Sequence, residues 1–107
     1  MSLDINLIEA SPHSVFETNI THNLNVMADK AGIHKALWRP EEVPITNASE
    51  LAAILAPAIA DMKARADYYR QFSASNGWGT YEQFIPWLER LEQACRDYPN
   101  ATLEVSR

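Results

Sequence analysis

The 107-residue sequence is poor in cysteine, glycine and basic residues, and it has no long hydrophobic run. Its single cysteine, Cys95, excludes an intrachain disulfide. The longest mostly apolar stretch, 51–60, is about half the length that a membrane helix needs and contains Pro57. A secretory signal needs a continuous apolar segment near the N-terminus. Asp4, Asn6 and Glu9 interrupt any such segment in this chain. We therefore expect a cytoplasmic protein.

The charge balance is acidic, with nine Lys and Arg against 14 Asp and Glu and a net charge of −5. The basic residues are scattered, whereas phosphate binding needs them clustered, so we expect no nucleic-acid partner. Two interpretations of the acidity remain. It suits a basic partner, or it is the ordinary solubility charge of a small domain, and the second is the commoner case.

Motifs for metal binding and catalysis are absent from the sequence. His13, His22 and His34 lie nine and 12 residues apart, without the short spacings of zinc ligands. Neither Gly-x-Ser-x-Gly nor His-Glu-x-x-His occurs, so we expect no metal and no cofactor, and a non-catalytic protein is favoured over an enzyme. Cys95 lies on an apolar helical stripe and is expected to be buried and inert. The helical carboxylates Asp61, Glu82, Glu89 and Glu92 are expected to face solvent.

Both ends of the chain alternate apolar and polar residues with a period of two, which predicts half-buried strands over 3–7, 16–20 and 103–105. Turn-forming residues occupy 11–14 and 99–100. An isolated strand cannot satisfy its backbone groups, so the last strand is expected to pair with one near the N-terminus.

The middle of the chain has helical periodicity over 24–31, 51–69 and 84–98. Asn47 with Glu50, and Thr80 with Gln83, have the spacing of capping boxes at the starts of the second and third helices. Gly32 stands where a glycine commonly follows a helix.

Pro57 and Pro86 fall inside the second and third helical patterns, on the side away from the apolar stripe. The apolar phase continues across each proline, so we expect two continuous, kinked helices. The alternative is a helix break at Pro57.

Together these patterns predict a single α+β domain spanning 1–107. A sheet of about three strands, built from the N-terminal region and the C-terminal strand, would be covered on one face by three helices. No βαβ alternation is visible, which excludes a doubly wound sheet.

The unusual residues lie in the predicted loops. The stretch 73–79 contains Asn76 and places Trp78 between two of the three glycines. A tryptophan in this setting is either exposed for binding or inserted into the core, and the buried arrangement is favoured because large aromatic side chains are mostly buried.

The start of the first helix is a second candidate site. Its free N–H groups could hold an anion, with His22 and Asn23 adding contacts. The favoured interpretation is simpler: Thr21 caps the helix, His22 is exposed and Asn23 bonds locally.

A third candidate is Trp38 with Arg39. The guanidinium could stack on the indole or bind a carboxylate, although such an arginine more often ties a loop to nearby carbonyls. His34 is close enough in sequence to join either arrangement.

The chain resembles an uncharacterised family of small phage and prophage proteins. The matching stretches cover nearly the whole chain: 1–4, 19–24, 27–28, 31–33, 37–42, 76–82, 94–95 and 105–107. The pattern is Ile-Thr-His-Asn-Leu, Leu-Trp-Arg-Pro-Glu-Glu and Asn-Gly-Trp-Gly-Thr-Tyr-Glu, and its more specific pieces are Thr-His-Asn-Leu and Asn-Gly-Trp-Gly. The resemblance implies a phage or prophage origin and a location in the bacterial host cell. It implies no particular activity.

Small phage accessory proteins often bind a host protein, including components of defence systems. We therefore predict a non-catalytic protein-binding module. One alternative is a small-molecule-binding protein or minimal enzyme. Another is a structural or assembly component, such as a homodimer paired through edge strands. The candidate binding residues are His22, Asn23, Trp38, Arg39, Asn76 and Trp78.

Overall fold

The two ends of the chain form one three-stranded antiparallel sheet. The computed structural model describes residues 2–10 and 13–107. The strands are β1 (Ser2–Ala10), β2 (His13–Thr21) and β3 (Thr102–Ser106), in the spatial order β2-β1-β3. The predicted pairing of the last strand with the N-terminal region is therefore confirmed. The first two residues of the turn expected over 11–14 lie outside the described residues.

The inner face of the sheet is apolar. Leu3, Ile5 and Leu7 of the central strand are fully buried. Ile20 lies opposite Leu3 on one side, and Val105 lies opposite Ile5 on the other. Because strand side chains alternate between faces, the intervening polar residues lie on the outer face.

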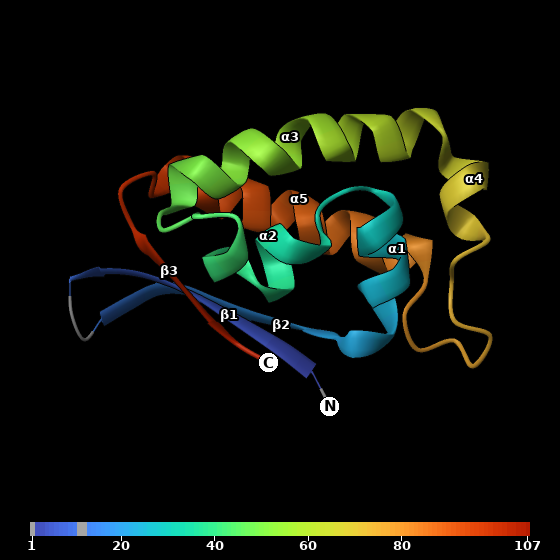
Figure 1. The fold of residues 1–107 in the computed structure, drawn as a ribbon, viewed down its shortest axis with the longest axis horizontal. Coiled ribbons are helices and arrows are strands. Elements are labelled where there is room, and N and C mark those ends of the chain that lie inside the picture. Colours follow the sequence, from blue (N-terminus) through green and yellow to red (C-terminus); the bar gives the residue numbers. More distant parts are fainter. Residues whose placement is uncertain (1, 11–12) are drawn as a thin grey trace.

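The helices lie on one side of the sheet (Figure 1). They are α1 (Asn25–Lys30), α2 (His34–Trp38), α3 (Ala48–Ala64), α4 (Ala66–Arg70) and α5 (Tyr81–Asp97), with 3-10 turns η1 (His22–Leu24) and η2 (Pro40–Glu42). α5 contacts β2 and α2 contacts β3, whereas α3 packs mainly on α5 in a layer further from the sheet (Figure 1). The α+β class is confirmed.

The two long helices begin and continue as the sequence predicts. The Oδ1 atom of Asn47 accepts from the Glu50 N–H at 3.0 Å, and the Oγ1 atom of Thr80 accepts from the Gln83 N–H at 3.2 Å. Both helices run through their prolines, and Pro57 and Pro86 are exposed. The alternative of a break at Pro57 is therefore wrong. An outward-facing proline removes one backbone hydrogen bond without disturbing the buried stripe.

The first and second helical patterns are each interrupted. Thr21 caps the 3-10 turn η1, which leads into α1, and a separate helix, α2, follows Gly32. The expected helix over 51–69 ends at Ala64 instead. The hydroxyl of Tyr69 donates to Asp61 at 2.6 Å and accepts from Arg65 at 3.1 Å, so α4 folds back against the end of α3.

Two of the sequence predictions concern side chains of α5, and the structure corrects one and confirms the other. Glu92 was expected to face solvent but is only 8% exposed, and its carboxylate lies 2.7 Å from the Nε atom of Arg96. Cys95 is buried as expected. Burial, together with the charge of Glu92, raises the pKa of the Cys95 thiol to about 12, so the thiol stays protonated at neutral pH.

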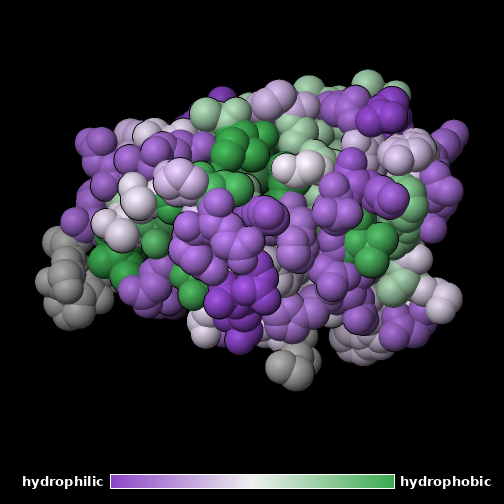
Figure 2. All heavy atoms as spheres, viewed as in Figure 1, coloured by the Kyte–Doolittle hydropathy of each residue, from purple (hydrophilic) through white to green (hydrophobic). Residues whose placement is uncertain are grey.

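Hydrophobic residues reach the face drawn in Figure 2 as separate patches among hydrophilic ones. The large apolar or aromatic side chains exposed in the described part of the chain are Val26, Tyr68 and Trp78. None of the described helices is both long and apolar enough to cross a membrane.

Candidate binding site at the Trp78 loop

The segment 71–80 joins α4 to α5 and displays Trp78, whose exposed fraction is 71%. The expectation of a buried Trp78 is therefore wrong. The reason lies in Gly79, which has a φ of +111° and packs its backbone against η1. A Cβ atom there would lie 3.0 Å from the Cβ of Asn23. The loop contacts the rest of the protein through glycine backbone, which leaves the indole outside.

Hydrogen bonds hold the backbone on both sides of Trp78. Its N–H donates to Oδ1 of Asn76 at 2.9 Å, and its carbonyl accepts from Nδ2 of Asn23 at 2.9 Å. The Gly79 N–H donates to Oε1 of Gln83 at 2.9 Å. The Ala74 N–H donates to the Gly79 carbonyl at 2.9 Å and closes the loop. The exposed indole therefore projects from a fixed backbone.

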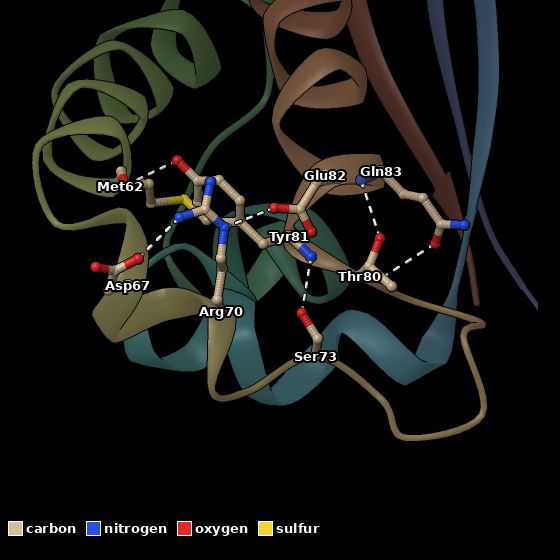
Figure 3. Close-up of polar contacts among 8 residues, drawn as sticks. All are labelled: Met62, Asp67, Arg70, Ser73, Thr80, Tyr81, Glu82 and Gln83. Carbon is tan, nitrogen blue, oxygen red and sulfur yellow. Dashed lines mark hydrogen bonds and ion pairs between the residues drawn. The ribbon is translucent and has the colours of Figure 1, made fainter.

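The start of α5 anchors the end of this loop (Figure 3). Thr80 and Gln83 form the capping box, and the Tyr81 N–H donates to Oγ of Ser73 at 2.9 Å. The Tyr81 hydroxyl donates to the buried carbonyl of Met62 at 3.1 Å. These bonds tie both ends of the loop to α3 and α5.

Arg70 anchors the start of the loop (Figure 3). Its Nε donates to Glu82 at 2.6 Å, its Nη1 donates to Asp67 at 2.9 Å, and its guanidinium carbon lies 4.8 Å from the centroid of the Tyr81 ring. The hydrogen bond from Arg70 is the main cause that lowers the pKa of Glu82. The Glu82 carboxylate is therefore charged at neutral pH.

A shallow groove of about 610 Å³ runs beside Trp78, between the loop and the end of the sheet. It is lined by Ser2, Asn19, Ile20, Thr21, Asn23, Trp78 and Gln83. The lining offers hydroxyl groups, amides and an aromatic ring, and none of these side chains is ionisable between pH 4 and pH 10. The groove is suited to hydrogen bonding and stacking rather than to acid–base chemistry.

His22 belongs to a different cluster. The Trp38 indole N–H donates to Nδ1 of His22 at 2.8 Å, and the ring of His34 stacks on Trp38 with centroids 5.2 Å apart. Nδ1 of His22 must carry a lone pair to accept this bond, which fixes the proton of the neutral ring on Nε2. His22 is therefore not the free, exposed residue that was favoured from the sequence.

Arg39 stays apart from both clusters. Its Nη1 lies 3.7 Å from Glu42, so its charged partner is a carboxylate. No stacking of Arg39 on Trp38 occurs among the cation–π contacts of the described residues. Arg107 instead donates to the Trp38 carbonyl at 2.9 Å.

Of the six sequence-derived candidates, the structure joins Asn23, Asn76 and Trp78 in one site and pairs His22 with Trp38 nearby. The Asn23 bond was expected to be local, but it spans 55 residues to Trp78. Sequence reasoning missed the groove residues of the strands, because their position depends on the β1–β2 register. It recognised Gln83 as part of a capping box but missed that this side chain also accepts from the Gly79 N–H and lines the groove.

The described residues contain no group of three or more His, Cys, Asp or Glu side chains that could hold a metal ion. No protein family, no curated protein and no solved structure matches the chain.

Proposed function

We propose that this chain is a small, non-catalytic protein-binding module of phage or prophage origin, and that Trp78 is the anchor of its binding surface. The observation that carries the proposal is the 71% exposure of Trp78 on a backbone held by hydrogen bonds. Tryptophan is enriched among the residues that contribute most to protein–protein affinity. A fixed backbone loses little conformational entropy when a partner binds.

The surroundings of Trp78 support the same function. Asn19, Thr21, Asn23 and Gln83 place polar groups along the groove beside the ring. An aromatic anchor with a polar rim is the usual arrangement of protein–protein interfaces. The phage origin rests on the resemblance of the segments 19–24, 37–42 and 76–82, and it makes a host protein, such as a defence component, the expected partner.

The test is affinity capture from a bacterial host lysate with immobilised wild-type protein, Trp78→Ala and Val26→Ala. Val26 is 50% exposed on α1 and serves as a matched control for an exposed apolar side chain. Loss of an anchor residue costs about 2 kcal/mol or more, so we expect Trp78→Ala to weaken binding of the captured protein by roughly 30-fold. Val26→Ala should bind like wild type.

Circular dichroism spectra of all three baits establish that each is folded. The proposal fails if folded wild-type protein captures no partner above background. It also fails if Trp78→Ala retains the partner as well as Val26→Ala does.

A further inference from the structure

The strands of the sheet carry negative charge on the face that is turned away from the helices. The three strands contain four carboxylates and no lysine or arginine. Asp4, Glu17 and Glu104 are exposed, and each belongs to the alternating set that faces away from the helices. None of the three makes an ion pair with a residue of 2–10 or 13–107.

The strand register brings these carboxylates together. Asn6 on the central strand lies opposite Glu17 on one side and Glu104 on the other. Two strand spacings separate the two glutamates, a distance of about 10 Å between Cα atoms. Asp4 lies two residues along from Asn6 on the same face. The distance between the two glutamates is comparable with the Debye length of about 8–10 Å in physiological salt. The electrostatic potentials of the three carboxylates therefore add over the face.

The basic residues lie in other parts of the chain. Eight of the nine lie between positions 30 and 96, which is the helical part of the chain. The ninth, Arg107, follows β3, but its guanidinium donates to the Trp38 carbonyl and to Glu41. The strands therefore account for four of the five units of net negative charge, because the rest of the chain has ten acidic and nine basic residues.

This acidic face continues into the Trp78 groove. Ser2, Asn19 and Thr21 line the groove and also belong to the outward-facing set of the strands. Asn19 lies directly opposite Asp4. One surface thus carries three carboxylates and, at its end, an exposed indole.

We propose that the outer sheet face docks a basic surface of the partner protein, with an arginine of that surface stacked on Trp78. The inference rests on the proposed function and specifies the chemistry of the partner. Carboxylates attract cationic side chains and speed the encounter, while an indole face is the preferred aromatic platform for a guanidinium. A second copy of the chain does not fit, because pairing two such faces would oppose like charges.

The probe is an acetylated nona-arginine peptide, titrated in low salt into isotope-labelled protein and followed by NMR. We expect shifts of the Trp78 indole and of the amides around Asp4, Asn6 and Glu17. The variant is Glu17→Gln with Glu104→Gln. The matched control is Asp29→Asn with Asp97→Asn, which removes two exposed carboxylates outside the sheet.

Each exposed ion pair contributes a few tenths of a kcal/mol to about 1 kcal/mol, so the double glutamine variant should bind the peptide roughly fivefold more weakly. The control should bind within about twofold of wild type, because its two carboxylates belong to helices and not to the strands that form the docking face. The free energy of unfolding of the glutamine variant should equal or exceed that of wild type, since removing like charges relieves repulsion. These three results support the inference.

The inference would be overturned if the peptide shifted the amides of Asp29 and Asp97 as much as those of the sheet face. It would also be overturned if both double variants lost the same affinity for the peptide. Absence of binding at low salt would also overturn it, as would a strongly acidic partner in the lysate capture. None of these outcomes bears on whether Trp78→Ala loses its partner, so the proposed function is judged separately.

Discussion

Trp38 and Trp78 are two tryptophans that contact the same short turn, η1, and serve opposite purposes. Trp38 is 4% exposed, donates its indole N–H to His22 and stacks on His34. Trp78 is 71% exposed, and its fixed contacts are made by its backbone, one of them to Asn23. His22 and Asn23 are adjacent in η1, so a single turn supports a core tryptophan and a surface one.

The difference teaches that sequence context decides how a tryptophan is used. Trp38 lies on a helix that presents its ring to the core, within reach of an acceptor for the indole N–H. Trp78 lies between glycines with positive φ, and the glycine backbone takes the place next to Asn23 that a side chain would otherwise fill. A core tryptophan stabilises the fold, whereas the exposed one is available to a partner.

The largest expected effect contrasts the two indoles directly. Trp38→Ala should lower the free energy of unfolding by about 3–5 kcal/mol, because it leaves a cavity and an unpaired His22 acceptor. Trp78→Ala should change it by no more than about 0.5 kcal/mol. Urea denaturation followed by circular dichroism measures both, and equal losses in the two variants would remove the contrast.

The second effect concerns the glycine that excludes the Trp78 side chain from the interior. Gly79→Ala should destabilise the protein by about 1–3 kcal/mol, because it combines a positive φ with a contact at 3.0 Å to Asn23. Gly32→Ala is the matched control, with a φ of +76° and open space around it, and should cost about 1 kcal/mol. Thermal unfolding of the two variants compares them. A smaller loss at Gly79 than at Gly32 would contradict the close packing of the loop on η1.

The third effect tests the bond that links the turn to the exposed tryptophan. Asn23→Ala should cost about 1 kcal/mol by removing the hydrogen bond to the Trp78 carbonyl. Amide hydrogen exchange should become faster in the loop 71–80, while the region around Trp38 keeps its protection. Unchanged exchange in the loop would show that Asn23 does not hold it.

The smallest effect is pH-dependent and concerns the Arg70 anchor of the loop. The folded protein lowers the pKa of Glu82, so its contribution to stability is complete above the ordinary value of about 4.3 and is lost as pH falls through the lowered value. Glu82→Gln should therefore be less stable than wild type at pH 7, and the two should converge in acid. If the difference in free energy of unfolding between the two proteins persisted below the lowered pKa, it would not arise from the Glu82 charge.

Much of the fold was predictable because it rests on local periodicity. The alternation in 3–7 and 103–105 identifies the strands, and the capping boxes at Asn47 and Thr80 mark the helix starts. The break at Arg65 was not predictable in this way. It depends on the Tyr69 hydroxyl reaching Asp61, while the apolar phase simply continues.

The candidate site was only partly predictable for the same physical reason. The Asn-Gly-Trp-Gly segment identified Asn76 and Trp78 as unusual, but the exposure of the ring depends on the approach of Gly79 to Asn23, 56 positions away. The acidic face could not be recognised before the register placed Glu17 and Glu104 on either side of Asn6. Contacts between distant segments have no short-range signature.

The central position of β1 has a consequence for synthesis. Its hairpin with β2 can close early, but its other edge must wait for Thr102–Ser106, because Asp4 pairs with Ser106. While the intervening segments emerge from the ribosome, the hairpin has an unoccupied hydrogen-bonding edge that could template association with another chain. The arrival of the last strand is therefore the step that covers this edge of β1 and leaves β1 paired on both sides.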